Sequence, residues 1–196
     1  MLRPSMAPKR PARVQATTVR VREAFVAERF GSSAVQRLRS LASPELRELL
    51  LAAGPPPGGW VPFSLFVEMN QLIDRSLGKG DGELVWESGR FAASHNAGVW
   101  KSLIMRHVTP AMLVSLASSL WSKHYDGGRL VSRPGGGSCV MVSIVDFPEP
   151  DPAHCRAIGG WMQGSLEMGP RKNPKVKEVA CRSAGAAICE FRLTWD

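Results

Sequence analysis

The spacing of apolar residues changes once along the chain, close to residues 126–128. Before that point, apolar residues recur every three to four positions, which is typical of amphipathic helices. Beyond it, short runs rich in Val and Ile flank Gly-containing turns, which is typical of hairpins. The two hairpins, near 129–147 and 175–195, have a helical pattern between them. The sequence therefore predicts several helices followed by a β-β-α-β-β unit.

Capping and chain-breaking residues set the bounds of the expected helices. Ser43 is a good N-cap, Pro44 suits the first turn, and Gly54 ends that helix. Gly31 is expected to stop another helix. Together with 43–54, the expected helices are 22–30, 32–42, 62–78, 82–97, 109–125 and 150–169.

Helices and hairpins that are segregated along a chain indicate an α+β fold. The two hairpins can pair into one four-stranded antiparallel sheet, with the amino-terminal helices packed on it. Apolar residues make up 44% of the 196 residues, which is enough for a sizeable core. We therefore expect residues 17–196 to form a single α+β domain.

Much of the net charge of +8 lies at the amino terminus. Residues 1–14 hold four basic residues and three prolines but no acidic residue. Such a stretch has little apolar surface to bury, so we expect residues 1–16 to be a disordered basic arm. Because the arm has no aromatic residues between its charges and no recognisable nucleic-acid-binding motif, binding to nucleic acid is not expected.

The sequence has no apolar run of transmembrane length and no signal-peptide core. We therefore expect a cytoplasmic chain without a membrane span. In that reducing compartment, the four cysteines are expected to be metal ligands or buried thiols rather than disulfides.

Three cysteines and a glutamate are placed so that they can meet at one metal ion. Glu178 and Cys181 have the spacing of a zinc knuckle in which Glu replaces the first Cys. Cys189 returns on the partner strand, and Cys155 lies on the helix between the hairpins. Spacing alone supports buried thiols equally well. Cys139 has no such partners, and we assign it to the core.

The carboxy-terminal half resembles the 4-vinyl-reductase-type ligand-binding domain, in "DPAHCRAIGGWMQGSLE" and "KEVACRSAGAAICEFRLTW". That superfamily also holds haem nitric-oxide-binding-associated domains and the small subunits of the TRAPP trafficking complex. The resemblance implies their nitric-oxide-signalling or TRAPP-like ligand-binding fold. It also implies structural zinc (Zn2+) as cofactor, bound by Cys155, Glu178, Cys181 and Cys189.

Most of the chain, 17–196, is also similar to an uncharacterised paralogous family expanded in myxobacteria. The similarity lies in "FVAERFG", "GDGELVWESGRFAA", "LWSKHYDGGRL" and "VDFPEPDPAHCRAIGGWMQG". That resemblance implies no activity. The sequence also has no phosphate-binding loop, no HExxH motif and no recognisable Ser/His/Asp arrangement, so no catalytic residue is predicted.

Aromatic residues on the helices offer a candidate ligand pocket. Trp121, His124 and Tyr125 supply an apolar wall with polar contacts, and Trp100 is a further candidate. Core packing is the competing interpretation of the same residues. The superfamily resemblance favours the pocket.

Three functions are compatible with these features. The first is a non-enzymatic sensory module that binds a small apolar or aromatic molecule, or an acyl chain, with zinc bracing the last hairpin. The second is a dimeric protein-interaction scaffold that resembles TRAPP small subunits and has no ligand. The third is an enzyme related to tetrapyrrole vinyl reductases. We favour the first, as a homodimer formed through the apolar helices 62–78 and 109–125, and a protein partner in signalling is compatible with it.

Overall fold

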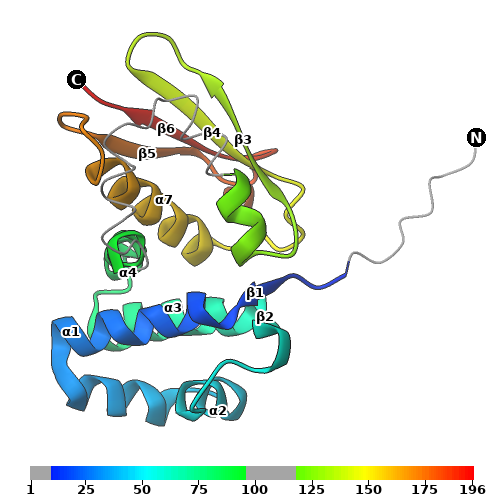
Figure 1. The fold of residues 1–196 in the computed structure, drawn as a ribbon, viewed down its shortest axis with the longest axis vertical. Coiled ribbons are helices and arrows are strands. Elements are labelled where there is room, and N and C mark those ends of the chain that lie inside the picture. Colours follow the sequence, from blue (N-terminus) through cyan, green and yellow to red (C-terminus); the bar gives the residue numbers. More distant parts are fainter. Residues whose placement is uncertain (1–9, 96–117) are drawn as a thin grey trace, which may run out of the picture.

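The computed structural model describes residues 10–95 and 118–196 of the chain. Its elements are β1 (Arg13–Gln15), α1 (Ala16–Leu41), α2 (Pro44–Leu51), β2 (Trp60–Pro62), α3 (Phe63–Leu77), α4 (Glu83–His95), β3 (Arg129–Pro134), β4 (Cys139–Val145), α7 (Pro152–Glu167), β5 (Lys175–Ala180) and β6 (Cys189–Thr194). They stack in layers (Figure 1): α7 lies on the sheet, α4 lies between α7 and the pair α1 and α3, and α2 lies at the far end.

The main sheet has the strand order β3-β4-β6-β5, and every neighbouring pair is antiparallel. The central strand β4 buries four consecutive residues, whereas the edge strand β5 alternates between exposed and half-buried positions. This arrangement confirms the predicted α+β class and the β-β-α-β-β order. Of the helix predicted over 109–125, residues 109–117 lie outside the described residues, and 118–124 are helical.

The predicted helix signals have clear structural counterparts. Ser43 caps α2 by accepting a hydrogen bond from the Leu46 amide at 3.2 Å. Gly31 breaks α1 with φ 80° and ψ 178°, a backbone conformation that glycine adopts without strain. The helices predicted over 22–30 and 32–42 therefore meet at a kink inside one element.

Ordered structure begins closer to the amino terminus than predicted. β1 pairs with β2, Ala12 and Val14 are buried, and the Ala12 amide donates a hydrogen bond to Glu149 Oε1 at 2.6 Å. Within the predicted disordered arm over 1–16, this corrects residues 10–16, whereas residues 1–9 lie outside the described residues and their disorder stays a prediction. A three-residue strand is too short to show a period in the sequence, and its partner lies far along the chain.

The helices α4 and α7 approach each other through glycine. A Cβ atom at Gly89 would lie 2.1 Å from the Ala157 carbonyl oxygen, and one at Gly160 would lie 1.9 Å from the Trp86 carbonyl oxygen. Because no side chain fits at these points, the two backbones pack directly against each other. This contact joins the helical layers to the layer that carries the sheet.

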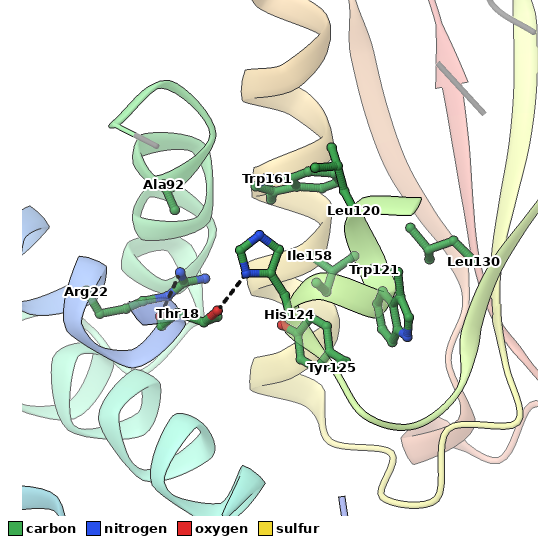
Figure 2. Close-up of a pocket in the computed structure, with 10 residues that line it drawn as sticks. All are labelled: Thr18, Arg22, Ala92, Leu120, Trp121, His124, Tyr125, Leu130, Ile158 and Trp161. Atoms are coloured by element: carbon green, nitrogen blue, oxygen red, sulfur yellow. Dashed lines mark hydrogen bonds between the residues drawn. The ribbon is translucent and has the colours of Figure 1, made fainter. Parts of the chain in front are cut away.

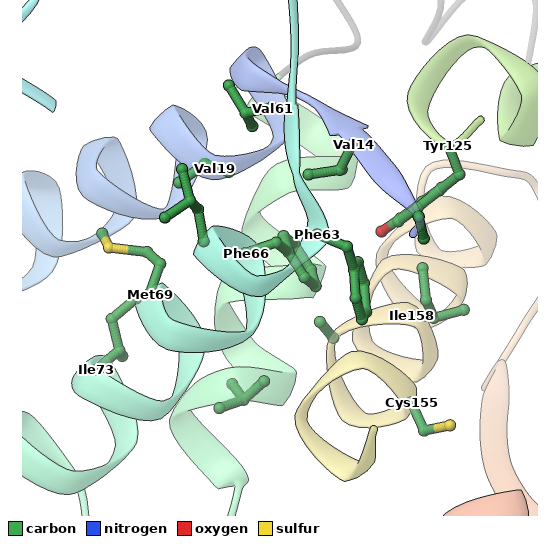
Figure 3. Close-up of a cluster of buried hydrophobic side chains, with 14 of the residues drawn as sticks. Val14, Val19, Val61, Phe63, Phe66, Met69, Ile73, Tyr125, Cys155 and Ile158 are labelled. Atoms are coloured by element: carbon green, nitrogen blue, oxygen red, sulfur yellow. The ribbon is translucent and has the colours of Figure 1, made fainter. Parts of the chain in front are cut away.

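An aromatic cluster fills the space between α3 and α7 (Figure 3). The imidazole of His154 lies in its middle, with ring centroids 4.8 Å from Phe147, 5.0 Å from Phe63 and 5.1 Å from Tyr125. Burial, followed by the nearby charge of Arg22, lowers the pKa of His154 to about 3. His154 is therefore neutral at pH 7 and acts as a core side chain. Within the described part of the chain, no helix is long and apolar enough to cross a membrane.

Candidate functional site

Three of the predicted ligand residues meet between α7 and the last hairpin. The Sγ atoms of Cys155, Cys181 and Cys189 all lie within 4.8 Å of one another. Figure 3 shows Cys155 pointing from α7 away from the labelled aromatic side chains. Cys181 directly follows β5, and the turn with Gly185 at φ 89° brings the chain back to Cys189 at the start of β6. Cys139 is not a member of this thiol cluster.

The fourth predicted residue, Glu178, lies beside the cluster but outside this 4.8 Å set. A register shift between Glu178 and Ala180 bends β5 just before Cys181. The Glu178 carboxylate contributes to a raised pKa of Cys181, after burial. Its Oε1 atom is buried and has no hydrogen-bond partner among the described residues. This carboxylate therefore lies next to Cys181 and is available as a fourth ligand.

The thiol cluster holds one negative charge more easily than isolated thiols would. A hydrogen bond from Cys155 lowers the pKa of Cys189 to about 6, and the Arg182 amide also donates to Cys189 Sγ, at 3.4 Å. The same Cys189 bond, followed by burial, raises the pKa of Cys155. The structure thus favours a thiolate at Cys189 with Cys155 as its donor, and thiolates are the form in which cysteine binds metals.

A second candidate site is a pocket between the helical layers (Figure 2). Its cavity volume is about 50 Å³. Three of the predicted pocket residues, Trp121, His124 and Tyr125, line it together, and Trp100 lies outside the described residues. The other lining residues are Thr18, Arg22, Ala92, Leu120, Leu130, Ile158 and Trp161.

One side of this pocket is aromatic and apolar. Trp121 and Tyr125 stack with ring centroids 4.3 Å apart, and Trp121 Nε1 donates to the Gly127 carbonyl oxygen at 2.8 Å. Leu120 and Ile158 continue this wall, and Figure 2 shows Trp161 above them on α7. Because the Trp121 N–H is satisfied by the backbone, the indole presents only apolar surface to the cavity.

The other side of the pocket is polar. The Thr18 hydroxyl and His124 Nδ1 are hydrogen-bonded at 3.2 Å, and Arg22 Nη1 donates to the Thr18 carbonyl oxygen at 3.1 Å. Figure 2 shows the Arg22 side chain reaching from α1 toward His124. The sequence prediction missed Thr18 and Arg22. A signal was present, because Arg22 lies three and four positions before Phe25 and Val26 and so shares their apolar helix face.

No protein family and no curated protein matches this sequence. Solved structures do match. An H-NOX protein from S. oneidensis in the Fe(II)NO ligation state has a TM-score of 0.68 at 14% identity, covering 93% of this chain and 99% of that chain. An Fe(II) unliganded H-NOX protein mutant from K. algicida has a TM-score of 0.66 at 12% identity, covering 93% of this chain and 96% of that chain.

Identities this low establish the fold alone, so the predicted α+β fold is confirmed. The resemblances to the 4-vinyl-reductase-type domain and to the myxobacterial family stay predictions. The cofactor prediction is corrected. The solved proteins with this fold are described with haem or with iron in the Fe(II) state, and these descriptions do not name structural zinc. Structural zinc is therefore withdrawn as the cofactor of this chain.

Proposed function

We propose that this chain is a non-enzymatic sensory module that binds a small ligand in the pocket between α1, α4, α7 and residues 118–125. The observation that carries the proposal is the pocket itself, in which an apolar aromatic wall faces a small set of convergent polar groups. Ligand sites have this composition. The S. oneidensis H-NOX protein named above, which shares the fold, is described in an Fe(II)NO ligation state, and this supports a sensory role.

The solved proteins with this fold are described with haem, so we compare the described residues of this chain with what a haem site needs. A cavity of about 50 Å³ is far smaller than an ordinary ligand pocket of about 300–1,000 Å³. His154, a candidate axial ligand, is enclosed by aromatic rings, and His124 is hydrogen-bonded to Thr18. The described residues therefore do not fit a haem. We expect purified protein to lack the intense visible absorption of haem, and its presence would contradict this conclusion.

The size of the cavity limits the ligand. A cavity of about 150 Å³ holds benzene, so the described cavity of about 50 Å³ suits a molecule of only a few heavy atoms. An aromatic ligand of the size of benzene is too large for this cavity. Native mass spectrometry of protein purified under mild conditions tests the function. We expect a bound small molecule that is released on denaturation, whereas chains that never carry or take up a ligand would contradict the proposal.

The thiol cluster is a separate candidate site. We propose that Cys155, Cys181 and Cys189, with Glu178 as the fourth ligand, bind a metal ion that braces the last hairpin against α7. The support is the gathering of three Sγ atoms within 4.8 Å, with a thiolate favoured at Cys189. Elemental analysis of the purified protein would identify the metal.

The scaffold alternative and the homodimer also stay proposals. The apolar residues of α3, on which the dimer prediction partly relied, are buried inside the chain, including Leu65, Phe66 and Met69. They therefore offer no surface for a partner. The most exposed large apolar side chains among the described residues are Leu41 and Leu51, at 52% and 61%. If a dimer forms, we propose this end of the molecule for it, and sedimentation at micromolar concentration would test the association.

A further inference from the structure

Arg22 is a buried cation without a counter-ion. Its side chain lies on α1, the residue is 3% exposed, and it lines the pocket. No carboxylate lies within 4.0 Å of its guanidinium among the described residues. The segments outside the described residues, 1–9 and 96–117, contain no Asp or Glu in their sequence. The chain therefore has no acidic side chain that pairs with Arg22.

The groups that face Arg22 do not neutralise it either. Phe66 packs against the guanidinium, with 4.9 Å from Arg22 Cζ to the ring centroid. Burial raises the pKa of Tyr125, so its hydroxyl stays protonated and carries no negative charge. Burial lowers the pKa of Arg22 to about 10, so the guanidinium itself remains charged at pH 7. A buried charge without a partner strongly destabilises the folded state, so the Arg22 guanidinium favours a partner from outside the chain.

The donors of Arg22 are also underused. Its Nη1 donates to the Thr18 carbonyl oxygen, but the buried Nε has no hydrogen-bond partner among the described residues. A guanidinium matches a carboxylate through two parallel N–H bonds. Across the cavity lie the apolar side chains Leu120, Ile158 and Trp161. The pocket therefore offers a cation at one end and an apolar wall at the other.

We infer that the ligand of this pocket is a small carboxylic acid, whose carboxylate pairs with Arg22 and whose short apolar tail lies against Leu120, Ile158 and Trp161. This inference rests on the proposed ligand-binding function and names the chemical class of the ligand. A neutral apolar molecule fills the same space but leaves the Arg22 charge unpaired.

Matched pairs of acids and amides test the inference in calorimetric titrations of the full chain. The probes are acetate with acetamide, and propionate with propionamide. Because a hydrogen bond to a charged group contributes about 1.5–3 kcal/mol, we expect each acid to bind about 10-fold to 150-fold more tightly than its amide. Equal binding of acid and amide would overturn the inference and leave the ligand pocket standing. Binding of neither would overturn the pocket function and the inference together.

Variants separate the charge from the packing of the side chain. Arg22→Met should remove the preference for acids, and Arg22→Lys should keep part of it, because it keeps the charge but not the planar pair of donors. Arg29→Met is the matched control, since Arg29 lies on the same helix in an exposed ion pair with Glu87. It should bind propionate like the wild type.

The ligand-free stability of Arg22→Met gives an independent readout. Replacing an unpaired buried charge with an apolar side chain of similar length should leave the unfolding temperature unchanged or raise it. Propionate should raise the unfolding temperature of the wild type and of Arg22→Lys but not that of Arg22→Met. A marked fall in the unfolding temperature of Arg22→Met, with propionate still stabilising it, would overturn the inference. If Arg22→Met does not fold, the acid and amide pairs with Arg22→Lys still decide the question.

Discussion

The Thr18 hydroxyl and the Nδ1 atom of His124 are hydrogen-bonded at 3.2 Å, although 106 positions separate the two residues in the sequence. The bond joins α1 to the helical residues 118–124 and closes the polar side of the pocket. The position of His124 against the cavity therefore depends on a side chain near the start of the described chain.

Replacing Thr18 with Val tests the contribution of this bond. The substitution keeps the shape of a buried side chain but removes its hydroxyl, so we expect a loss of about 1 kcal/mol in the free energy of unfolding. For a chain of this length, that corresponds to a fall of about 2–4 °C in the unfolding temperature. Thr17→Val is the matched control, because Thr17 is exposed. Equal effects of the two variants would show that the bond to His124 adds nothing.

The close contact between α4 and α7 predicts a sensitive glycine. In Gly160→Ala, the new methyl group would overlap the Trp86 carbonyl oxygen, so the two helices must separate. We expect a loss of about 1–3 kcal/mol or more in chemical unfolding experiments. Gly54→Ala provides the comparison, since a Cβ atom there meets nothing within 4 Å, and its effect should stay within about 0.5 kcal/mol. A Gly160→Ala variant as stable as the wild type would contradict the described packing.

Truncation distinguishes the ordered part of the amino terminus from the residues before it. Deleting residues 1–9 should have little effect on the unfolding temperature, because their sequence offers little apolar surface to bury. Deleting residues 1–15 removes buried Val14 and the β1–β2 pairing, so we expect a loss of about 2–4 kcal/mol. Thermal unfolding of the two truncated proteins measures the difference. Equal unfolding temperatures of the two truncated proteins would contradict a stabilising role of β1.

Metal content and stability should change together in the thiol cluster. Cys181→Ser and Cys189→Ser should lower the metal content measured by elemental analysis and also lower the unfolding temperature, because the ion joins two elements distant in sequence. Glu178→Gln should weaken binding without abolishing it. Cys139→Ser is the control, since Cys139 is not in the cluster. If wild-type protein purified in the absence of chelators holds no metal, the result would contradict a metal site at the thiol cluster.

Local signals in the sequence predicted much of the fold. The change of apolar period near residues 126–128 marks the passage from helices to hairpins, Ser43 caps α2, and Gly31 breaks α1. Each of these signals acts within a few residues, so no tertiary information is needed to interpret it. β1 was missed because three residues carry no period, and because its pairing with β2 crosses more than forty positions.

The candidate sites were predicted only in part, for a related reason. The order of the elements around Cys155, Cys181 and Cys189 was readable, whereas the approach of their Sγ atoms to within 4.8 Å depends on the packing of α7 against the last hairpin. Arg22 shares the apolar helix face of Phe25 and Val26, but its charge pointed to solvent, since an Arg on a helix is most often solvated. Only the three-dimensional structure shows that this Arg is buried and that no acid lies beside it.

Filling the pocket tests the central claim, that it binds a small ligand, most directly. Ala92 is 2% exposed and lines the cavity from α4, so Ala92→Leu places three more carbon atoms where the ligand would lie. Ser94→Leu, at an exposed position two residues later, is the control. With propionate and propionamide as probes in calorimetry, we expect binding to the wild type and to Ser94→Leu. We expect no binding to Ala92→Leu, although this variant should unfold at a temperature close to that of the wild type. Undiminished binding to Ala92→Leu would contradict the assignment of the ligand to this pocket.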